Sequence, residues 1–113
     1  MHILLADDEQ FILDLMQMVL AGAGHTVRAV PDGGQALKAY EAEKFDLVIT
    51  DLSMPHLDGS ALAKEIKGRD PSQKVVLLSG YSDENTPPPY VDHVLSKPVK
   101  IDDLTSLVAR LGA

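Results

Sequence analysis

The residues of this chain that are best suited to chemistry are acids placed directly after apolar stretches. The first apolar stretch ends in Asp7, Asp8 and Glu9, and a later one ends in Asp51. Carboxylates repel one another, and partial burial at the end of a strand raises that cost. If two such strand ends lie side by side in one sheet, a cation is needed between them. A site with oxygen ligands alone favours Mg²⁺ or a similarly hard divalent ion.

One lysine stands where it can reach the same place. Lys97 follows the last apolar stretch of the chain and precedes Pro98. Each of these residues also has an ordinary interpretation. Acids after a strand often cap the next helix or interact favourably with its dipole, and we assign Glu9 to that role. A lysine before a proline is usually a solvated loop residue, and a hydroxyl such as that of Ser79 is usually bonded to local backbone.

Length and composition limit the classes of protein that fit. The 113 residues form one domain, residues 1–113, with a core of ordinary size. The net charge of −7 argues against direct nucleic-acid binding. The chain has no cysteine, which fits a reducing cytoplasm. No stretch is long and apolar enough for a membrane span, and the N-terminus lacks the pattern of a signal peptide, so we expect neither membrane insertion nor secretion.

The apolar pattern predicts strands that alternate with helices. The predicted strands are residues 3–6, 26–30, 45–50, 74–79 and 93–96. A helix is expected at residues 9–22, two more begin at Asp32 and at Asp58, and a last one carries Leu104 and Leu107. This alternation predicts an α/β fold, an open, doubly wound sheet of five parallel strands in the order 2-1-3-4-5. Ligands of such sheets bind where the strand order reverses, between strands 1 and 3, which is where Asp7, Asp8 and Asp51 fall.

One segment departs from the alternation. A helix is expected between strands 4 and 5, but the chain there contains three consecutive prolines, residues 87–89. Prolines lack the backbone donor that a helix needs, and a run of them favours an extended conformation. We therefore expect the fourth helix of the pattern to be missing or shortened, leaving a mobile segment and exposed apolar surface near Tyr90, Val91 and Val94.

Taken together, the motifs identify a family. They are Asp7-Asp8, Asp51, Met54-Pro55, Asp58-Gly59, Ser79 and Lys97-Pro98, each at its own strand end. Each motif is weak alone, but the ordered set, spread over the whole chain, resembles the receiver domain of bacterial two-component response regulators, the CheY-like fold.

The resemblance implies a role for each site residue. Asp51 would be the phosphoacceptor, which takes a phosphoryl group from a histidine kinase or a histidine phosphotransfer protein. Mg²⁺ would be held by Asp8, Asp51 and the backbone carbonyl of Ser53, with Asp7 acting through water. Catalysis would consist mainly of cancelling charge and aligning an in-line attack.

Two further residues would contact the phosphoryl group by the same resemblance. Lys97 would pair with one phosphoryl oxygen, and the Ser79 hydroxyl would bond another. The Lys97–Pro98 peptide bond is usually cis in this family. The implied protein is no enzyme beyond catalysing its own phosphorylation and dephosphorylation, and it signals by contact with a downstream protein target.

Other functions fit the residues less well. A flavin carrier would need a glycine- and hydroxyl-rich loop after the first strand, and a dehalogenase-type phosphatase would need an acid at Ser53. Val94 stands where many receivers have a switch aromatic, so the signal must be transmitted in another way. Because the chain begins at Met1 and ends after its last helix, we expect a stand-alone receiver. The alternatives are a receiver module of a hybrid histidine kinase and a degenerate receiver that is not phosphorylated.

Overall fold

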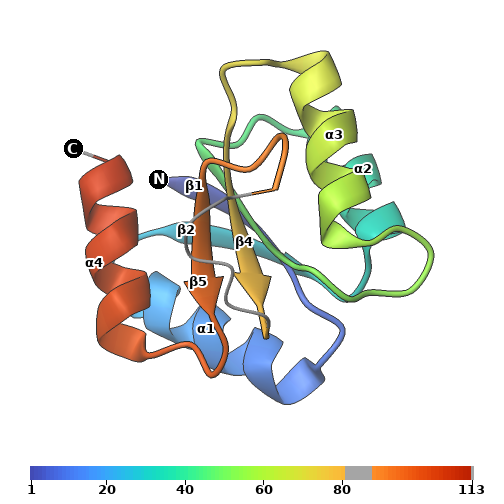
Figure 1. Ribbon diagram of the computed structural model, residues 1–113. Helices are drawn as coiled ribbons and strands as arrows, with labels where there is room; N and C mark the ends of the chain where they lie inside the picture. Colours follow the sequence, from blue (N-terminus) through green and yellow to red (C-terminus); the bar gives the residue numbers. More distant parts are fainter. Residues whose placement is uncertain (81–87, 113) are drawn as a thin grey trace.

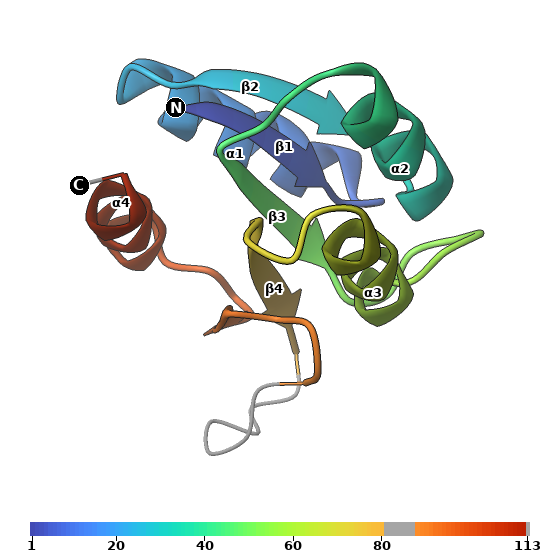
Figure 2. The same ribbon diagram turned by 90° about the horizontal axis from the view of Figure 1, so that it is seen from above.

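The chain folds as a parallel sheet with helices on both faces (Figures 1 and 2). The computed structural model describes residues 1–80 and 88–112. The strands are β1 (His2–Ala6), β2 (Thr26–Val30), β3 (Leu47–Asp51), β4 (Lys74–Ser79) and β5 (His93–Ser96). The helices are α1 (Gln10–Gly22), α2 (Gly33–Ala42), α3 (Gly59–Arg69) and α4 (Ile101–Leu111). All strand pairs are parallel, in the order β2-β1-β3-β4-β5, which confirms the predicted fold.

The burial of each strand follows from its place in the sheet. β3 is buried along its whole length, as expected of a central strand whose two faces are covered by helices. β2 lies at one edge and alternates between exposed and more buried residues, so Arg28 there reaches solvent. β5 forms the opposite edge, and none of its four residues is fully buried.

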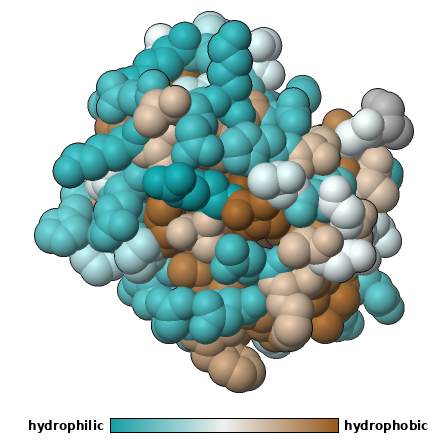
Figure 3. All heavy atoms as spheres, turned by 180° about the vertical axis from the view of Figure 1, so that it is seen from behind, coloured by the Kyte–Doolittle hydropathy of each residue, from teal (hydrophilic) through white to brown (hydrophobic). Residues whose placement is uncertain are grey.

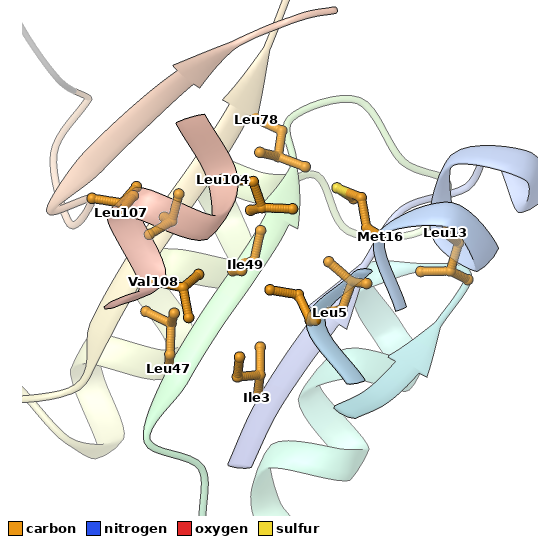
Figure 4. Close-up of a cluster of buried hydrophobic side chains, with 12 residues drawn as sticks. Ile3, Leu5, Leu13, Met16, Leu47, Ile49, Leu78, Leu104, Leu107 and Val108 are labelled. Atoms are coloured by element: carbon orange, nitrogen blue, oxygen red, sulfur yellow. The ribbon is translucent and has the colours of Figure 1, made fainter. Parts of the chain in front are cut away.

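Two apolar cores fill the space between the sheet and its helices. One joins the sheet to α1 and α4 through side chains such as Leu5, Met16 and Leu104 (Figure 4). The other joins the opposite face to α2 and α3 through residues such as Val48 and Leu62. Burying one aliphatic side chain of this size contributes about 1.5–3 kcal/mol, so the two cores together hold the strand ends in register.

Side-chain caps begin two of the helices where the sequence predicts them. The Asp32 carboxylate accepts a hydrogen bond from the Gln35 amide at 2.7 Å, and Asp58 accepts one from the Ala61 amide at 2.8 Å. Such caps satisfy backbone donors that the first turn leaves unpaired. The Gln35 side chain donates to the Asp32 carboxylate, whereas a full capping box would bond the Asp32 backbone.

Two sequence-based expectations are wrong in detail. The third strand begins at Leu47 and ends at Asp51, so it lies one to two residues later than predicted. The register with β4 pairs Asp51 with Leu78 and extends the ladder to the acid. The helical spacing of apolar residues from Phe11 to Leu20 also predicts that Phe11 faces the core, but Phe11 is 77% exposed, whereas Met16 and Leu20 of the same series are buried, together with Leu13. The helix is apolar on more than one side, so periodicity alone did not place Phe11 correctly.

The connection between β4 and β5 contains the predicted break in the pattern. Gly80 and residues 88–92 form no helix, and residues 81–87, where the expected loss of a helix mostly falls, lie outside the described residues. The view from behind shows mainly hydrophilic side chains with apolar patches between them (Figure 3).

The described helices also bear on membrane insertion. No helix in the described ranges is long and apolar enough to cross a membrane.

Candidate functional site

The acids converge because β1 and β3 are neighbours. The register pairs Ala6 of β1 with Thr50 of β3, so the next residue of each strand, Asp7 and Asp51, emerges at the same edge of the sheet. Figure 2 shows the carboxyl ends of these two strands side by side. Ligand oxygens of Asp7, Asp8 and Asp51 all lie within 4.8 Å of one another. The sheet topology therefore assembles the predicted cluster of carboxylates.

The most deeply buried acid of the cluster is Asp7, which is fully inaccessible to solvent. Its Oδ1 accepts a hydrogen bond from the Glu9 amide at 2.9 Å. Its Oδ2 is buried without a hydrogen bond among the described residues. Burial raises the pKa of Asp7, the Glu9 amide opposes that rise, and the charge of Asp51 adds to it. Asp7 is thus a carboxylate for which the protein alone provides incomplete compensation.

Asp51 is held firmly at the end of β3. Its side chain is 7% exposed, and its Oδ1 accepts a hydrogen bond from the Leu52 amide at 2.9 Å. The start of α3 packs directly on its backbone, since a Cβ added to Gly59 would lie 2.3 Å from the Asp51 carbonyl oxygen. The Gly59 amide donates to the Leu52 carbonyl at 2.8 Å. Only glycine fits at position 59, and the contact fixes the backbone at Asp51.

Lys97 brings one positive charge to this cluster. Its Nζ lies 3.0 Å from Asp51 Oδ1 and 3.5 Å from both Asp7 Oδ2 and Glu9 Oε1. The Lys97 amide donates to the Ser79 carbonyl at 2.8 Å, and the Lys97–Pro98 peptide bond is cis, as the resemblance implied. Burial alone would lower the pKa of Lys97, but its hydrogen bond to Asp51 and the surrounding acids outweigh burial and raise it.

A small cavity opens over these side chains. It measures about 300 Å³ and is lined by Asp8, Glu9, Asp51, Leu52, Ser53, Gly80 and Lys97. Most of the predicted site residues therefore border one space. Asp7 lies buried beneath it, and Ser79 is the last residue of β4, 5% exposed and next to the cavity-lining Gly80. The structure brings every predicted site residue to this edge of the sheet.

The donor set fits a hard divalent cation. The cluster offers carboxylate oxygens, one of them a buried oxygen without a hydrogen bond, and the Ser53 residue borders the same cavity. One lysine cannot balance Asp7, Asp8 and Asp51 together. Mg²⁺ prefers oxygen ligands and usually keeps several waters, which the open side of the cavity can supply.

Sequence reasoning missed the place of Glu9 in this site. Its side chain makes no capping hydrogen bond, although it occupies the N-cap position of α1. Its carboxylate is turned toward Lys97. The contact joins two residues far apart in the sequence, and the local pattern around Glu9 looks the same for a capping acid. Only the spatial arrangement reveals it.

A larger apolar groove adjoins the site. It measures about 550 Å³ and lies between α1 and α4, where Ile12, Met16, Val99 and Leu104 contribute to its lining. Glu9 and Lys97 line this groove as well as the cavity over the acids. The two residues therefore separate a polar space from an apolar one.

Comparisons with known proteins agree with this geometry. A family model described as "Response regulator receiver domain" matches residues 3–109. The response regulator receiver protein CpdR of Brucella abortus is 30% identical, over 97% of this chain and 95% of its own length. Other curated relatives are several times longer. The chain spans 20% of the length of transcription factor SKN7 of Candida albicans and 23% of that of the transcriptional regulator NtrC of Escherichia coli.

Solved structures give the same result. Response regulator TrrA of Thermotoga maritima, crystallised in complex with Mg²⁺ and BeF, is 31% identical with a TM-score of 0.89, and the match covers 97% of both chains. The receiver domain of the hybrid histidine kinase CckA is 30% identical with a TM-score of 0.85, and the match covers 98% of both chains.

Proposed function

Because the chain belongs to the response regulator receiver domain family of two-component systems, we propose that it accepts a phosphoryl group on Asp51. The observation that carries this assignment is the contact at 3.0 Å between the Asp51 carboxylate and Lys97, within the cluster of three acids. We take the whole chain, residues 1–113, as one receiver domain. Its activity is limited to its own phosphorylation and dephosphorylation.

The reaction is an in-line phosphoryl transfer. A carboxylate oxygen of Asp51 forms a bond to phosphorus while the bond from phosphorus to the donor's histidine nitrogen breaks, and that nitrogen takes up a proton. Both the nucleophile and the donor are negative, so the site must cancel charge and align the two groups. The Leu52 amide orients the Asp51 carboxylate for the attack, and the packing of Gly59 holds the backbone of Asp51 in place.

The other site residues divide the remaining tasks. Asp8, Asp51 and the Ser53 carbonyl would hold Mg²⁺, with Asp7 acting through water. When bound, Mg²⁺ would supply positive charge that offsets the negative charge of the acids and of the phosphoryl oxygens. Lys97 turns from Asp51 to one phosphoryl oxygen, and the Ser79 hydroxyl bonds another. The assignment is supported by the shared cavity, which Asp8, Asp51, Ser53 and Lys97 all line.

The partners follow from this chemistry. A histidine kinase or a histidine phosphotransfer protein supplies the phosphoryl group, and a downstream protein reads the phosphorylated surface in the cytoplasm. The chain itself contacts neither nucleic acid nor membrane. A second candidate role is a receiver module of a hybrid histidine kinase, which the likeness to the CckA receiver favours. Assays that compare the rate of phosphoryl transfer from separate kinases and from phosphotransfer proteins distinguish the two roles.

The test uses a small phosphodonor such as phosphoramidate with Mg²⁺. Wild-type protein should gain the mass of one phosphoryl group, and Asp51→Asn should gain none. Asp46→Asn is the matched control, because Asp46 lies just before the other end of β3 and its carboxylate accepts a hydrogen bond only from the His2 amide among the described residues. Phosphorylation of Asp51→Asn at the wild-type rate would show that another residue is the acceptor. Wild-type protein that takes no phosphate would identify a degenerate receiver.

A further inference from the structure

Two hydrogen bonds fix the backbone of Glu9 at a place from which its side chain reaches Lys97. The Glu9 amide donates to Asp7 Oδ1 at 2.9 Å, and the Glu9 carbonyl accepts from the Leu13 amide at 2.9 Å. The side chain does not cap α1. Its Oε1 lies 3.5 Å from Lys97 Nζ, across the boundary between the polar cavity and the apolar groove.

Lys97 has three acidic neighbours, and they differ in kind. Asp51 and Asp7 belong to the carboxylate cluster that fits a cation, whereas Glu9 is not part of it. When a divalent cation balances the cluster, the attraction of Asp7 and Asp51 for Lys97 falls. Glu9 then remains, among the described residues, the acid that still attracts the ammonium.

This attraction opposes the proposed role of Lys97. Its ammonium must move from the acids to a phosphoryl oxygen, so any acid that stays paired with it favours the unphosphorylated arrangement. Glu9 is 63% exposed on its side chain, so solvent screens the pair and the opposition is modest. Glu9 also lines the cavity over the acids, where its negative charge repels an anionic phosphodonor.

We propose that Glu9 is a positioning residue that competes with the phosphoryl group for Lys97, so that its negative charge weakens the phosphorylated state. The inference rests on the proposed function, since it assumes that Asp51 is the acceptor. Glu9 thereby lowers the tendency of the Lys97 ammonium to move from the acids to the phosphoryl group.

The experiment compares Glu9→Gln with wild type in two measurements. Glu9→Gln keeps the size of the side chain and removes its charge. With saturating Mg²⁺, its affinity for beryllofluoride, a phosphoryl mimic, should rise about threefold to fivefold, as expected for the loss of one screened ion pair. The gain should shrink as salt concentration rises. In the metal-free protein with chelator, the ¹³C chemical shift of the Lys97 Cε should change on substitution, which reports the contact directly.

Asp14→Asn is the matched control. Asp14 is an exposed acid of α1 whose carboxylate accepts a hydrogen bond from the Gln10 side chain, and the described residues show no contact between Asp14 and Lys97. It should change neither the beryllofluoride affinity nor the Lys97 shift. Glu9→Asp, which keeps the charge on a shorter side chain, should bring the affinity back toward the wild-type value.

The outcomes separate this inference from the proposed function. If wild type binds beryllofluoride and Glu9→Gln binds it equally or more weakly, the competition by Glu9 is disproved and the function of Asp51 stands. Equal gains in Glu9→Gln and Asp14→Asn would show a general effect of net charge and would overturn the inference. If wild type neither binds beryllofluoride nor accepts phosphate, the proposed function fails and the inference fails with it.

Discussion

Two groups of partly buried charges in this molecule differ in their balance. On one side, Lys67 of α3 and Asp92 before β5 form a pair at 2.7 Å, with side chains 15% and 24% exposed. On the other, Lys97 pairs with Asp7 and Asp51 of the carboxylate cluster, to which the exposed Asp8 adds a third negative charge. The paired charges are compensated and hold elements together. The crowded acids are under-compensated, which favours the binding of a cation. The balance of charge thus separates a structural site from a functional one.

The largest effect is expected from breaking the balanced pair. Lys67→Met leaves the Asp92 carboxylate partly buried without its cation and also removes a donor to the Gln73 carbonyl. The free energy of unfolding should fall by about 1–3 kcal/mol, below the range for a fully buried pair because some solvent reaches both groups. Urea denaturation measures it.

Lys64→Met is the control for this change. Lys64 is an exposed lysine of the same helix, and the described residues show no ion pair for it. Its unfolding free energy should stay close to that of wild type. Equal changes in the two variants would show that the contact of Lys67 with Asp92 adds no specific stability.

A smaller effect of opposite sign is expected at the crowded acids. With chelator present, Asp7→Asn should raise the free energy of unfolding by about 1 kcal/mol, because it removes a buried charge and keeps the acceptor for the Glu9 amide. Adding Mg²⁺ at about ten times its dissociation constant should stabilise wild type by about 1.4 kcal/mol and the variant by less. A variant less stable than wild type in chelator would contradict the under-compensation of this site.

The smallest effect is the dependence of these differences on pH, and its sign separates the two sites. Burial would raise the pKa of Asp92, but bonds from Lys67 and the Val75 amide outweigh burial and lower it. Its contribution to stability is therefore complete above the unfolded value of 3.8 and is lost as pH falls through the lower folded pKa.

Asp7 behaves in the opposite way. Burial raises its pKa, so its ionisation costs stability, and that cost appears as pH rises from 3.8 through the folded value. The advantage of Asp7→Asn should vanish at low pH and grow toward neutrality in chelator. The loss in Asp92→Asn should be present at neutrality and vanish only in stronger acid. Urea midpoints from about pH 3 to pH 7 test both trends, and parallel curves would refute the contrast.

The sequence was sufficient for the features that depend on local pattern and strand order. Alternating strands and helices predicted the sheet. The positions of the strand ends predicted that Asp7, Asp8, Asp51 and Lys97 would lie close together. The residues that were misjudged depend on tertiary contacts. Phe11 lies on an outer face that periodicity could not distinguish, and the ladder with β4 moved the end of β3 to Asp51. Glu9 has the local setting of a capping acid, and its contact with Lys97 exists only after folding.

The hydrogen bonds of Asp92 bear on how the length of the connection between β4 and β5 can change. The Asp92 amide donates to the Val75 carbonyl at 2.9 Å, and the Val75 amide donates to the Asp92 carboxylate at 2.8 Å. With Lys67, these bonds set the register of β5 just before the strand begins. Residues can be inserted or removed between Gly80 and Asp92 without sliding β5 along β4, because loop closure depends only weakly on loop length. This connection should therefore tolerate changes of length, or a grafted peptide, while the carboxylate cluster keeps its geometry.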